Sequence, residues 1–241
     1  METRTALVTG AAQGLGQEFA VALAGRGYRV AGLDLIPQPE TAKRVLDYVE
    51  LIADVTDEAQ IASALERVID RFGTLHVLVN NAGVYPESAF EDTTPEEWRR
   101  VMRVNLEAPF LMARAVLPHL KAAGWGRIVN ITSAAVLTAP PTMVAYVSSK
   151  AGLIGLTRTL ASALGPYDIT VNAIAPSMVR TATAERTVGA DGGFERVLVQ
   201  QAVPRTQQPC DLVSTLLYVV DEGSGFLTGQ TLNVAGGSAY L

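Results

Sequence analysis

Tyr146 and Lys150 are two proton-exchanging side chains that stand four residues apart in an apolar stretch rich in alanine and glycine. If this stretch is a helix, residues four apart lie one above the other on the same face. A free phenol has a pKa of about 10, and a nearby ammonium stabilises the phenolate and lowers that pKa. The spacing therefore predicts a tyrosine that transfers protons near neutral pH. Ser133, expected at the carboxyl end of a preceding strand, could hydrogen-bond the same substrate oxygen.

This pair also has an ordinary structural interpretation. A tyrosine four residues before a lysine is common on amphipathic helices, where the lysine is solvated and the phenol lies at the boundary with water. The pair alone does not establish catalysis, and the catalytic interpretation requires a cofactor site elsewhere in the chain.

The N-terminal segment has the organisation of a dinucleotide-binding turn. The apolar run Thr5–Thr9 predicts a strand, which breaks into a glycine-rich turn and continues as a helical pattern. Glycines let the backbone turn tightly and approach a pyrophosphate, and the helix N-terminus offers free N–H groups to its phosphates. The glycine spacing differs from the usual G-x-G-x-x-G, but strand, turn and helix are the context that such a site needs. The residues predicted to bind the cofactor here are Gly10, Gln13, Gly14, Leu15 and Gly16.

Asp34 follows the next predicted strand, Tyr28–Leu33, at about 20 residues past the glycines. A carboxylate in this position accepts hydrogen bonds from the adenosine ribose hydroxyls and repels a 2′-phosphate. The glycine turn contains Gln13 and no arginine that could hold such a phosphate. Both features favour NAD over NADP, and a solvated carboxylate at a strand end is the alternative interpretation.

Further candidate residues follow the next two predicted strands. Val49–Ala53 predicts a strand that leads into Asp54 and Val55, which we expect on the adenine side, and Leu75–Val79 predicts another. Ligands of open α/β sheets bind in the crevice outside the carboxyl ends of the strands. Three small or amide residues follow the second strand and fit that crevice, although a plain turn would explain them equally well: Asn81, Ala82 and Gly83.

Asn105 interrupts the apolar pattern of a long helical region that runs from Pro95 towards His119, in which Pro109 is a second expected interruption. Asparagine disfavours the interior of a helix and must find hydrogen-bond partners when it is buried. We expect Asn105 to kink the helix, to hold a water molecule or to be a buried structural residue.

The composition limits the class of protein. Of the 241 residues, 49% are hydrophobic and 18% are charged, which is enough apolar material for a sizeable core and too much for a disordered chain. A net charge of −5 argues against nucleic acid and anionic membranes as partners. The single cysteine excludes an intrachain disulfide, and the two histidines have no acidic or cysteine cluster at metal-ligand spacing. Without a signal-peptide pattern or an apolar run of membrane-spanning length, we expect a cytoplasmic protein without a metal.

Strand and helix patterns alternate along the chain without a linker, a repeat or a low-complexity tract. This alternation predicts one α/β domain over residues 1–241, built as a doubly wound parallel sheet with helices on both faces. Residues 177–203 contain no clear core element apart from a short helix expected at Phe194–Gln200. This stretch is predicted to be a mobile lid over a substrate.

With these motifs in place, the chain resembles the short-chain dehydrogenase/reductase family over nearly its whole length. The matching segments occur in the family's order: Thr9–Gly16, Asn80–Gly83, Asn105, Ser133, Tyr146–Lys150, Thr181 and Thr228–Gly237. The resemblance implies a seven-stranded Rossmann sheet that binds a nicotinamide dinucleotide. Three positions depart from the family's pattern: Ser177 stands where glycine is common, and His76 and Ala235 stand where aspartate is common.

The resemblance also implies roles for the matched residues. Tyr146 would be the general acid/base, Lys150 would lower its pKa and bind the nicotinamide ribose, and Ser133 would orient the substrate oxygen. Asn105 would fix a water molecule that leads to Lys150, and Thr181 would contact the nicotinamide carboxamide or the pyrophosphate. Further backbone contacts to the cofactor would come from Val55, Ala82 and the segment Ile174–Pro176.

The segment Pro176–Thr183 is similar to that of NAD-dependent secondary alcohol dehydrogenases of the phenylethanol type. Five side chains near Tyr146 predict an apolar pocket: Val136, Leu137, Pro140, Met143 and Met178. The expected reaction is hydride transfer between NAD and an aryl or alkyl secondary alcohol or ketone. Two alternatives are a 3-oxoacyl thioester reductase, whose usual NADPH is disfavoured by Asp34, and a nucleotide-binding sensor without catalysis. The resemblance further implies a homodimer or homotetramer.

Overall fold

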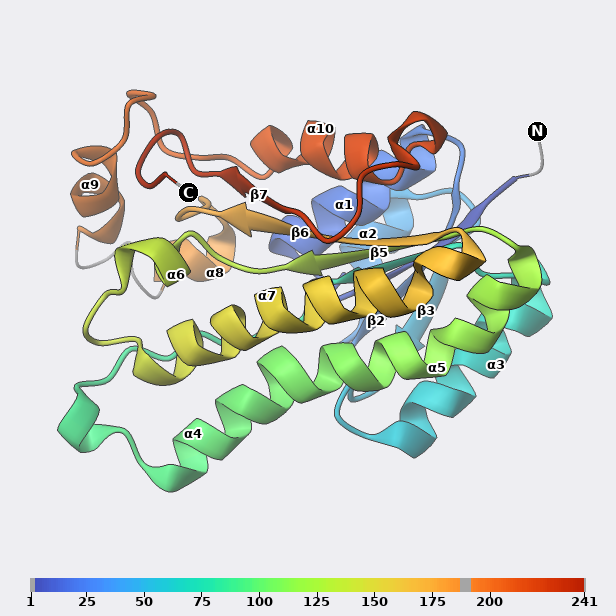
Figure 1. Ribbon diagram of the computed structural model, residues 1–241, viewed down its shortest axis with the longest axis horizontal. Helices are drawn as coiled ribbons and strands as arrows, with labels where there is room; N and C mark the ends of the chain where they lie inside the picture. The colour runs from blue at the N-terminus through green and yellow to red at the C-terminus, as the bar shows by residue number, and fades with distance from the viewer. Residues whose placement is uncertain (1–2, 187–191, 241) are drawn as a thin grey trace.

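The computed structural model describes residues 3–186 and 192–240 and contains a seven-stranded parallel sheet in the order β3-β2-β1-β4-β5-β6-β7 (Figure 1). The strands are β1 (Thr5–Thr9), β2 (Arg29–Asp34), β3 (Val49–Ile52), β4 (Val77–Asn80), β5 (Gly126–Ile131), β6 (Ile169–Pro176) and β7 (Thr231–Val234). The strand order reverses between β1 and β4, and such a switch point is where open α/β sheets bind ligands. The predicted doubly wound α/β fold is confirmed.

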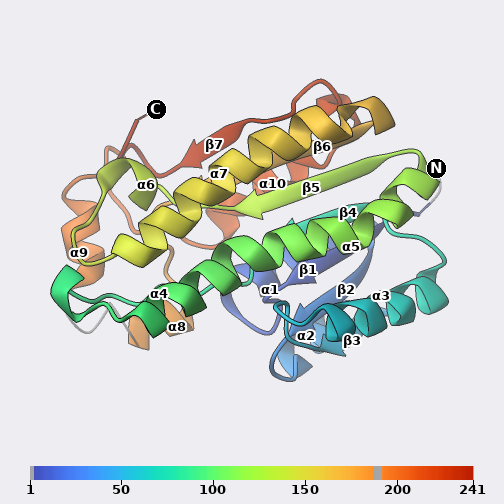
Figure 2. The same cartoon turned by 60° about the horizontal axis from the view of Figure 1, so that its bottom comes forward.

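Helices cover both faces of the sheet. Figures 1 and 2 show α3, α5 and α7 on one face and α1 and α10 on the other, whereas α6, α8 and α9 lie beyond the carboxyl ends of the strands. The helices are α1 (Gly14–Gly25), α2 (Pro39–Arg44), α3 (Glu58–Phe72), α4 (Pro95–Met102), α5 (Ala108–Ala123), α6 (Ala135–Thr138), α7 (Val144–Leu164), α8 (Ala182–Ala184), α9 (Gly193–Leu198) and α10 (Cys210–Val219).

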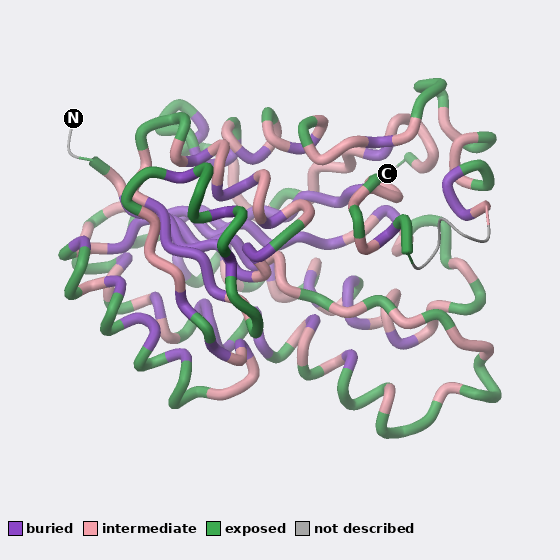
Figure 3. The backbone as a smooth tube through the Cα atoms, turned by 180° about the vertical axis from the view of Figure 1, so that it is seen from behind, coloured by how far each residue is buried: buried purple, intermediate pink, exposed green. Residues whose placement is uncertain are grey.

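The strands are buried on both faces, because successive side chains point to opposite sides of a sheet. Leu7 packs in one core cluster with Val116 of α5, and its neighbour Val8 packs in the other with Leu216 of α10. Figure 3 shows the buried residues concentrated along the strands. Two well-packed layers therefore fix the positions of the strand ends and of the loops that leave them.

The long helix formed by α4 and α5 is interrupted around Asn105, one of the two expected positions, and before Pro109, the other. A π-helical turn over residues 103–107 joins the two helices, and the N–H of Ala108 donates to the carbonyl five residues earlier. In a regular α-helix, Pro109 would offer no N–H to the carbonyl of Asn105, and its ring would clash with that carbonyl. The wider turn relieves this conflict, and its fully buried Asn105 faces α7 and the loop after β4.

Residues 3–186 and 192–240 include no helix that combines the length and the hydrophobicity needed to cross a membrane. In the same part of the chain, no three His, Cys, Asp or Glu side chains come together as the ligands of a metal ion would. The N–H of Thr5 donates to Nδ1 of His76 over 3.0 Å, so this histidine joins the beginning of β1 to the segment before β4.

Candidate active site

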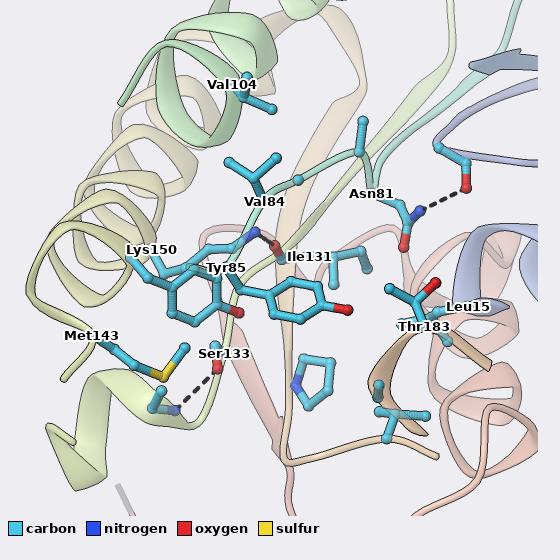
Figure 4. Close-up of a pocket in the computed structure, with 18 of the residues that line it drawn as sticks. Leu15, Asn81, Val84, Tyr85, Val104, Ile131, Ser133, Met143, Lys150 and Thr183 are labelled. Carbon is cyan, nitrogen blue, oxygen red and sulfur yellow. Dashed lines mark hydrogen bonds between the residues drawn. The ribbon is translucent and has the colours of Figure 1, made fainter. Parts of the chain in front are cut away.

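A cavity of about 1390 Å³ opens at the carboxyl ends of the strands, between the loops that follow β1 to β6 (Figure 4). It is lined by most of the predicted site residues: Gly10, Gln13, Gly14, Leu15, Asp34, Asp54, Val55, Asn81, Ala82, Gly83, Ser133, Tyr146, Lys150, Pro176 and Thr181. Gly16 and Asn105 do not line the cavity and lie behind its wall. The residues predicted for cofactor binding and those predicted for proton transfer therefore share one cavity.

The glycine turn is tied to the loop after β4 by Thr9 and Asn81. The side-chain amide of Asn81 donates to the carbonyls of Thr9, over 2.9 Å, and Gly10, over 3.2 Å. The Thr9 hydroxyl accepts the N–H groups of Asn81 and Ala82, both over 3.0 Å. Gly10 and Gly14 have φ angles of +67° and +60°, which favour glycine, and a Cβ on Gly10 would come within 2.8 Å of the Asn81 amide. The sequence motif contained Thr9, but only the structure shows that it holds two loops together.

Gly16 provides a test of this close packing, because a Cβ there would overlap the carbonyl oxygen of Gly10. We expect Gly16→Ala to lower the free energy of unfolding by about 2 kcal/mol, since the backbone must move to admit the methyl group. The displaced turn should also bind NADH about tenfold more weakly or worse. The matched control is Gly155→Ala on α7, where an added Cβ meets nothing within 4 Å. It should raise the free energy of unfolding by about 0.5–1 kcal/mol.

Chemical denaturation and fluorescence titration with NADH measure both effects. Similar stability and NADH affinity in the two glycine variants would show that the turn is not packed as described.

Two carboxylates lie at the ends of β2 and β3. Asp34 accepts the N–H of Ala12 over 2.9 Å, which ties the end of β2 to the glycine turn. Asp54 accepts the N–H of Thr56 over 2.8 Å and so shapes the turn after β3. Both aspartates are only partly buried and line the cavity. An ionised carboxylate has about four acceptor sites, so each retains capacity to bind a ligand.

Asn105 binds the loop after β4 by hydrogen bonds on the side away from the cavity. Its Oδ1 accepts the N–H of Val84 over 2.9 Å, and its Nδ2 donates to the carbonyl of Val84 over 2.8 Å and to the Ser149 hydroxyl over 3.1 Å. A Cβ on Gly83 would lie 3.2 Å from Oδ1 of Asn105 and 3.6 Å from Nζ of Lys150, so these two side chains are neighbours. Asn105 is thus a satisfied buried amide, and its predicted water molecule stays a prediction.

Tyr146 and Lys150 come from α7, and Ser133 comes from the loop after β5. Nζ of Lys150 donates to the carbonyl of Ile131 over 2.7 Å and lies 5.7 Å from the centroid of the Tyr146 ring. The Ser133 hydroxyl accepts the N–H of Ala135 over 3.1 Å and lies near enough to Tyr146 to lower the pKa of its phenol. A hydroxyl, a phenol and an ammonium therefore meet at one wall of the cavity.

The pKa values of this group differ from the prediction. Burial raises the pKa of Tyr146 above its ordinary value, and the nearby Ser133 hydroxyl offsets only part of that rise. Burial also lowers the pKa of Lys150 to about 8. The predicted net fall of the Tyr146 pKa is not found, because the desolvation of the buried phenol outweighs the groups that favour its ionised form. At neutral pH the phenol is protonated, and the lysine is mostly cationic.

The pocket wall around α6 also differs in part from the prediction. Of the five predicted apolar residues, Pro140, Met143 and Met178 line the cavity, whereas Val136 and Leu137 do not. Because α6 is a single helical turn, its successive side chains face different directions. Thr138 lines the cavity, and Leu137 is 39% exposed. The prediction assumed that neighbouring residues would all face the substrate.

Tyr85 lines the same cavity and was not predicted. Its ring centroid lies 6.5 Å from that of Tyr146, with the ring planes at 74°. The only local signal for this residue is that it follows the strand-end segment Asn80–Gly83 at the crevice. An aromatic residue in a loop gives no indication of which way its ring points.

The predicted lid includes several residues of the cavity wall. Thr181 accepts the N–H of Ala184 over 3.1 Å at the start of α8, and its methyl group would lie 3.4 Å from a Cβ on Gly14. The N–H of Ser177 donates to the side chain of Gln207 over 3.0 Å. The helix predicted near residue 194 is α9. Residues 187–191 of the predicted lid lie outside the described part of the chain.

The lining fits a nicotinamide dinucleotide. The glycine turn brings the N-terminus of α1, which has no acidic residue in its first turn, to the cavity, and this suits a pyrophosphate. Gly10 and Gly14 leave the backbone uncovered for close approach. Asp34 presents acceptors for ribose hydroxyls, and Tyr146 and Lys150 would hold the nicotinamide end.

The comparisons with known proteins agree with this fit. The sequence profile of the family described as "Enoyl-(Acyl carrier protein) reductase" matches residues 10–239. Trans-4-hydroxycyclohexanecarboxylate dehydrogenase of Sinomonas cyclohexanicum is 37% identical over 248 residues, covering 97% of this chain and 92% of that protein. D-beta-hydroxybutyrate dehydrogenase of Rhizobium meliloti is 34% identical over 254 residues, with 98% of both chains covered.

Two further relatives also match over nearly the whole chain. The 3-oxoacyl-(acyl-carrier-protein) reductase FabG of Staphylococcus aureus is 32% identical over 243 residues, with 98% of both chains covered. A crystal structure from Sinorhizobium meliloti 1021, assigned to the short-chain alcohol dehydrogenases, is similar with a TM-score of 0.93 and 32% identity, covering 99% of this chain and 97% of that one. The chain therefore belongs to the short-chain dehydrogenase/reductase family and is a dehydrogenase of CH–OH groups.

Proposed function

We propose that this chain transfers a hydride between NAD(H) and a secondary alcohol or the corresponding ketone. The observation that carries the proposal is that Ser133, Tyr146 and Lys150 line the same cavity as the glycine turn and Asp34. An enzyme acting on a carbinol must hold a proton-transfer group beside the ring that exchanges the hydride. One cavity with both sets of residues meets that requirement.

The bound dinucleotide supplies or accepts the hydride. The Ser133 hydroxyl orients the substrate oxygen by a hydrogen bond. Tyr146 is protonated at neutral pH, as a free phenol is, and burial favours that form further by raising its pKa, so it can donate a proton to the oxygen of a ketone. Lys150 stabilises the phenolate that this transfer leaves. In alcohol oxidation the same phenolate accepts the hydroxyl proton.

We propose NAD as the cofactor, because the Asp34 carboxylate lies at the end of β2 and would repel a 2′-phosphate. Asp34→Asn keeps an acceptor for the N–H of Ala12 and removes the charge. We expect this change to raise the ratio of NADPH to NADH turnover by about tenfold or more. The control is Asp92→Asn, at an exposed aspartate that does not line the cavity, and it should leave the ratio unchanged. An NADPH preference in the unmodified enzyme would refute the choice of NAD.

The walls of the cavity support a substrate with an apolar substituent. Pro140, Met143, Met178 and Tyr85 line it near the proton-transfer group. Two relatives are named as dehydrogenases of hydroxyl-bearing compounds, trans-4-hydroxycyclohexanecarboxylate and D-beta-hydroxybutyrate. We therefore propose an aryl or alkyl secondary alcohol. A screen of such alcohols with NAD, followed by NADH absorbance, tests the proposal, and no turnover with any of them would contradict it.

A second candidate function is reduction of a 3-oxoacyl thioester, which is favoured by the similarity to the FabG reductase. The two functions differ in cofactor and substrate. Turnover of acetoacetyl-CoA with NADPH that exceeds turnover of simple ketones with NADH would favour the thioester reductase. The complete set of Asn105, Ser133, Tyr146 and Lys150 argues against a sensor that binds nucleotide without catalysis.

We also propose a homo-oligomer and a substrate cover formed by residues 177–203. An apolar groove on α4, α5 and α7 supports self-association, because Trp98 and Phe110 are 39% and 45% exposed there beside Leu106 and Leu156. Ser177, Thr181 and several other residues of the 177–203 stretch line the cavity, which supports the covering role.

A further inference from the structure

Tyr85 is an aromatic side chain of the cavity wall, and the proposed reaction uses it only as apolar surface. Its edge-to-face arrangement with Tyr146, at 6.5 Å between centroids, lies in the range in which aromatic rings attract. Tyr85 is 37% exposed, and Figure 4 shows it extending across the cavity towards the side that carries Leu15 and Thr183. The ring is therefore accessible to a molecule bound beside Tyr146.

The backbone that carries this ring is held in place. Both backbone polar groups of Val84 are bonded to the Asn105 side chain, which is fully buried. The residue after Tyr85 is Pro86, and a residue before proline is restricted to extended conformations. The position of the ring is thus set by its neighbours before any ligand arrives, and little ordering is needed on binding.

The cavity wall opposite Tyr85 contains a flexible side chain instead of a rigid ring. Met143, which also lines the cavity, has a flexible side chain that adapts to irregular shapes. The N–H of Ser88 donates to the carbonyl of Thr142 over 2.8 Å, so the loop that carries Tyr85 is joined to the segment that carries Met143. A ketone whose oxygen is held at Tyr146 would place one substituent towards each wall.

We propose that Tyr85 determines substrate specificity by packing its ring against a planar aryl substituent of the ketone, so that aryl ketones are preferred over alkyl ketones. This inference rests on the proposed function. A planar aromatic group gains stacking or edge-to-face attraction that an alkyl chain lacks. Met143 accommodates the second substituent, whatever its shape. The preference for aryl ketones over alkyl ketones is therefore determined by Tyr85 and not by Met143.

The test compares Tyr85→Leu, which removes the ring, with Tyr85→Phe, which keeps it. We expect Tyr85→Leu to lower kcat/KM for acetophenone by about fivefold and to leave kcat/KM for 2-octanone within about twofold. Tyr85→Phe should stay close to the unmodified enzyme for both ketones, and the Kd for NADH should not change in either variant. Tyr218→Leu, at a tyrosine that is 55% exposed on α10, is the control for a tyrosine-to-leucine change outside the cavity.

An equal loss for both ketones in Tyr85→Leu would mean a purely structural role and would overturn the inference, as would no change for either ketone. A loss in Tyr85→Phe as large as in Tyr85→Leu would assign the effect to the hydroxyl and overturn it too. If the unmodified enzyme reduces neither ketone, the proposed function fails, and binding of acetophenone to the NADH-loaded protein decides the inference. Weaker binding in Tyr85→Leu alone supports the inference, and equal or undetectable binding in all variants overturns it.

Discussion

Tyr146→Phe is expected to lower kcat for ketone reduction by about 10³-fold or more while the Kd for NADH stays within about twofold. The substitution removes one oxygen and keeps the ring, so the packing against Tyr85 and the shape of the cavity persist. The missing group is the protonated phenol that donates to the substrate oxygen. The Ser133 hydroxyl remains, but an aliphatic alcohol is a much weaker acid than a phenol and is a poorer proton donor.

Steady-state kinetics with one ketone and titration of NADH fluorescence measure the two quantities separately. Tyr218→Phe on α10 is the control, because this tyrosine is exposed and does not line the cavity. It should leave both quantities unchanged. A Tyr146→Phe variant with more than about a tenth of the normal kcat would rule out this tyrosine as the proton donor.

Lys150→Met is expected to lower kcat/KM for reduction by about 10²-fold or more, because the phenolate left by proton transfer loses its cation. Methionine has a similar length and no charge, so it removes a desolvated ammonium and also leaves the carbonyl of Ile131 without its 2.7 Å donor. These two changes oppose each other, and the free energy of unfolding should move by less than about 2 kcal/mol. If Lys150→Met loses activity but stays folded, the loss is due to the missing cation in the proton-transfer step.

The pH dependence of kcat/KM is a second test of the role of the Lys150 charge. Its pKa is lowered to about 8 by burial, so the cation is present below pH 8 and is lost as the pH rises above that value. We expect kcat/KM for reduction, which reports groups of the free enzyme, to fall above about pH 8. Lys150→Arg keeps its charge at any accessible pH and should lack this fall. A fall of the same size and midpoint in Lys150→Arg would assign the titration to another group.

The fold was predictable because the sheet leaves a strong pattern in the sequence. β1 and β5 are buried along their whole length and contain the short apolar runs Ala6–Val8 and Ile128–Val129, and the glycine turn marks the junction of β1 with α1. The interruption of the long helix was placed by Asn105, which disfavours a helix interior and lies within the π-helical turn over residues 103–107. The π-helical form of the turn was not predicted, because periodicity does not distinguish it from a kink.

Site residues that lie at the ends of strands were predictable. Site residues whose role depends on the direction of a side chain were not. Asp34, Asn81 and Ser133 follow strands of one parallel sheet, so they had to meet at one edge. The directions of Leu137 and Tyr85 depend on the orientation of a short helix and a loop, which spacing does not fix. The pKa of Tyr146 depends on how far the folded chain removes water from the phenol, and the four-residue spacing to a lysine contains no information about that.

Transfer of deuterium to acetophenone from NADH that carries deuterium at both C4 positions of the nicotinamide tests the central claim most directly. The account predicts that the unmodified enzyme forms 1-phenylethanol carrying one deuterium on the carbinol carbon, measured by mass spectrometry, and that Tyr146→Phe forms almost none at equal NADH occupancy. Product that lacks the deuterium, or equal product from the Tyr146→Phe variant, would contradict hydride transfer assisted by this phenol.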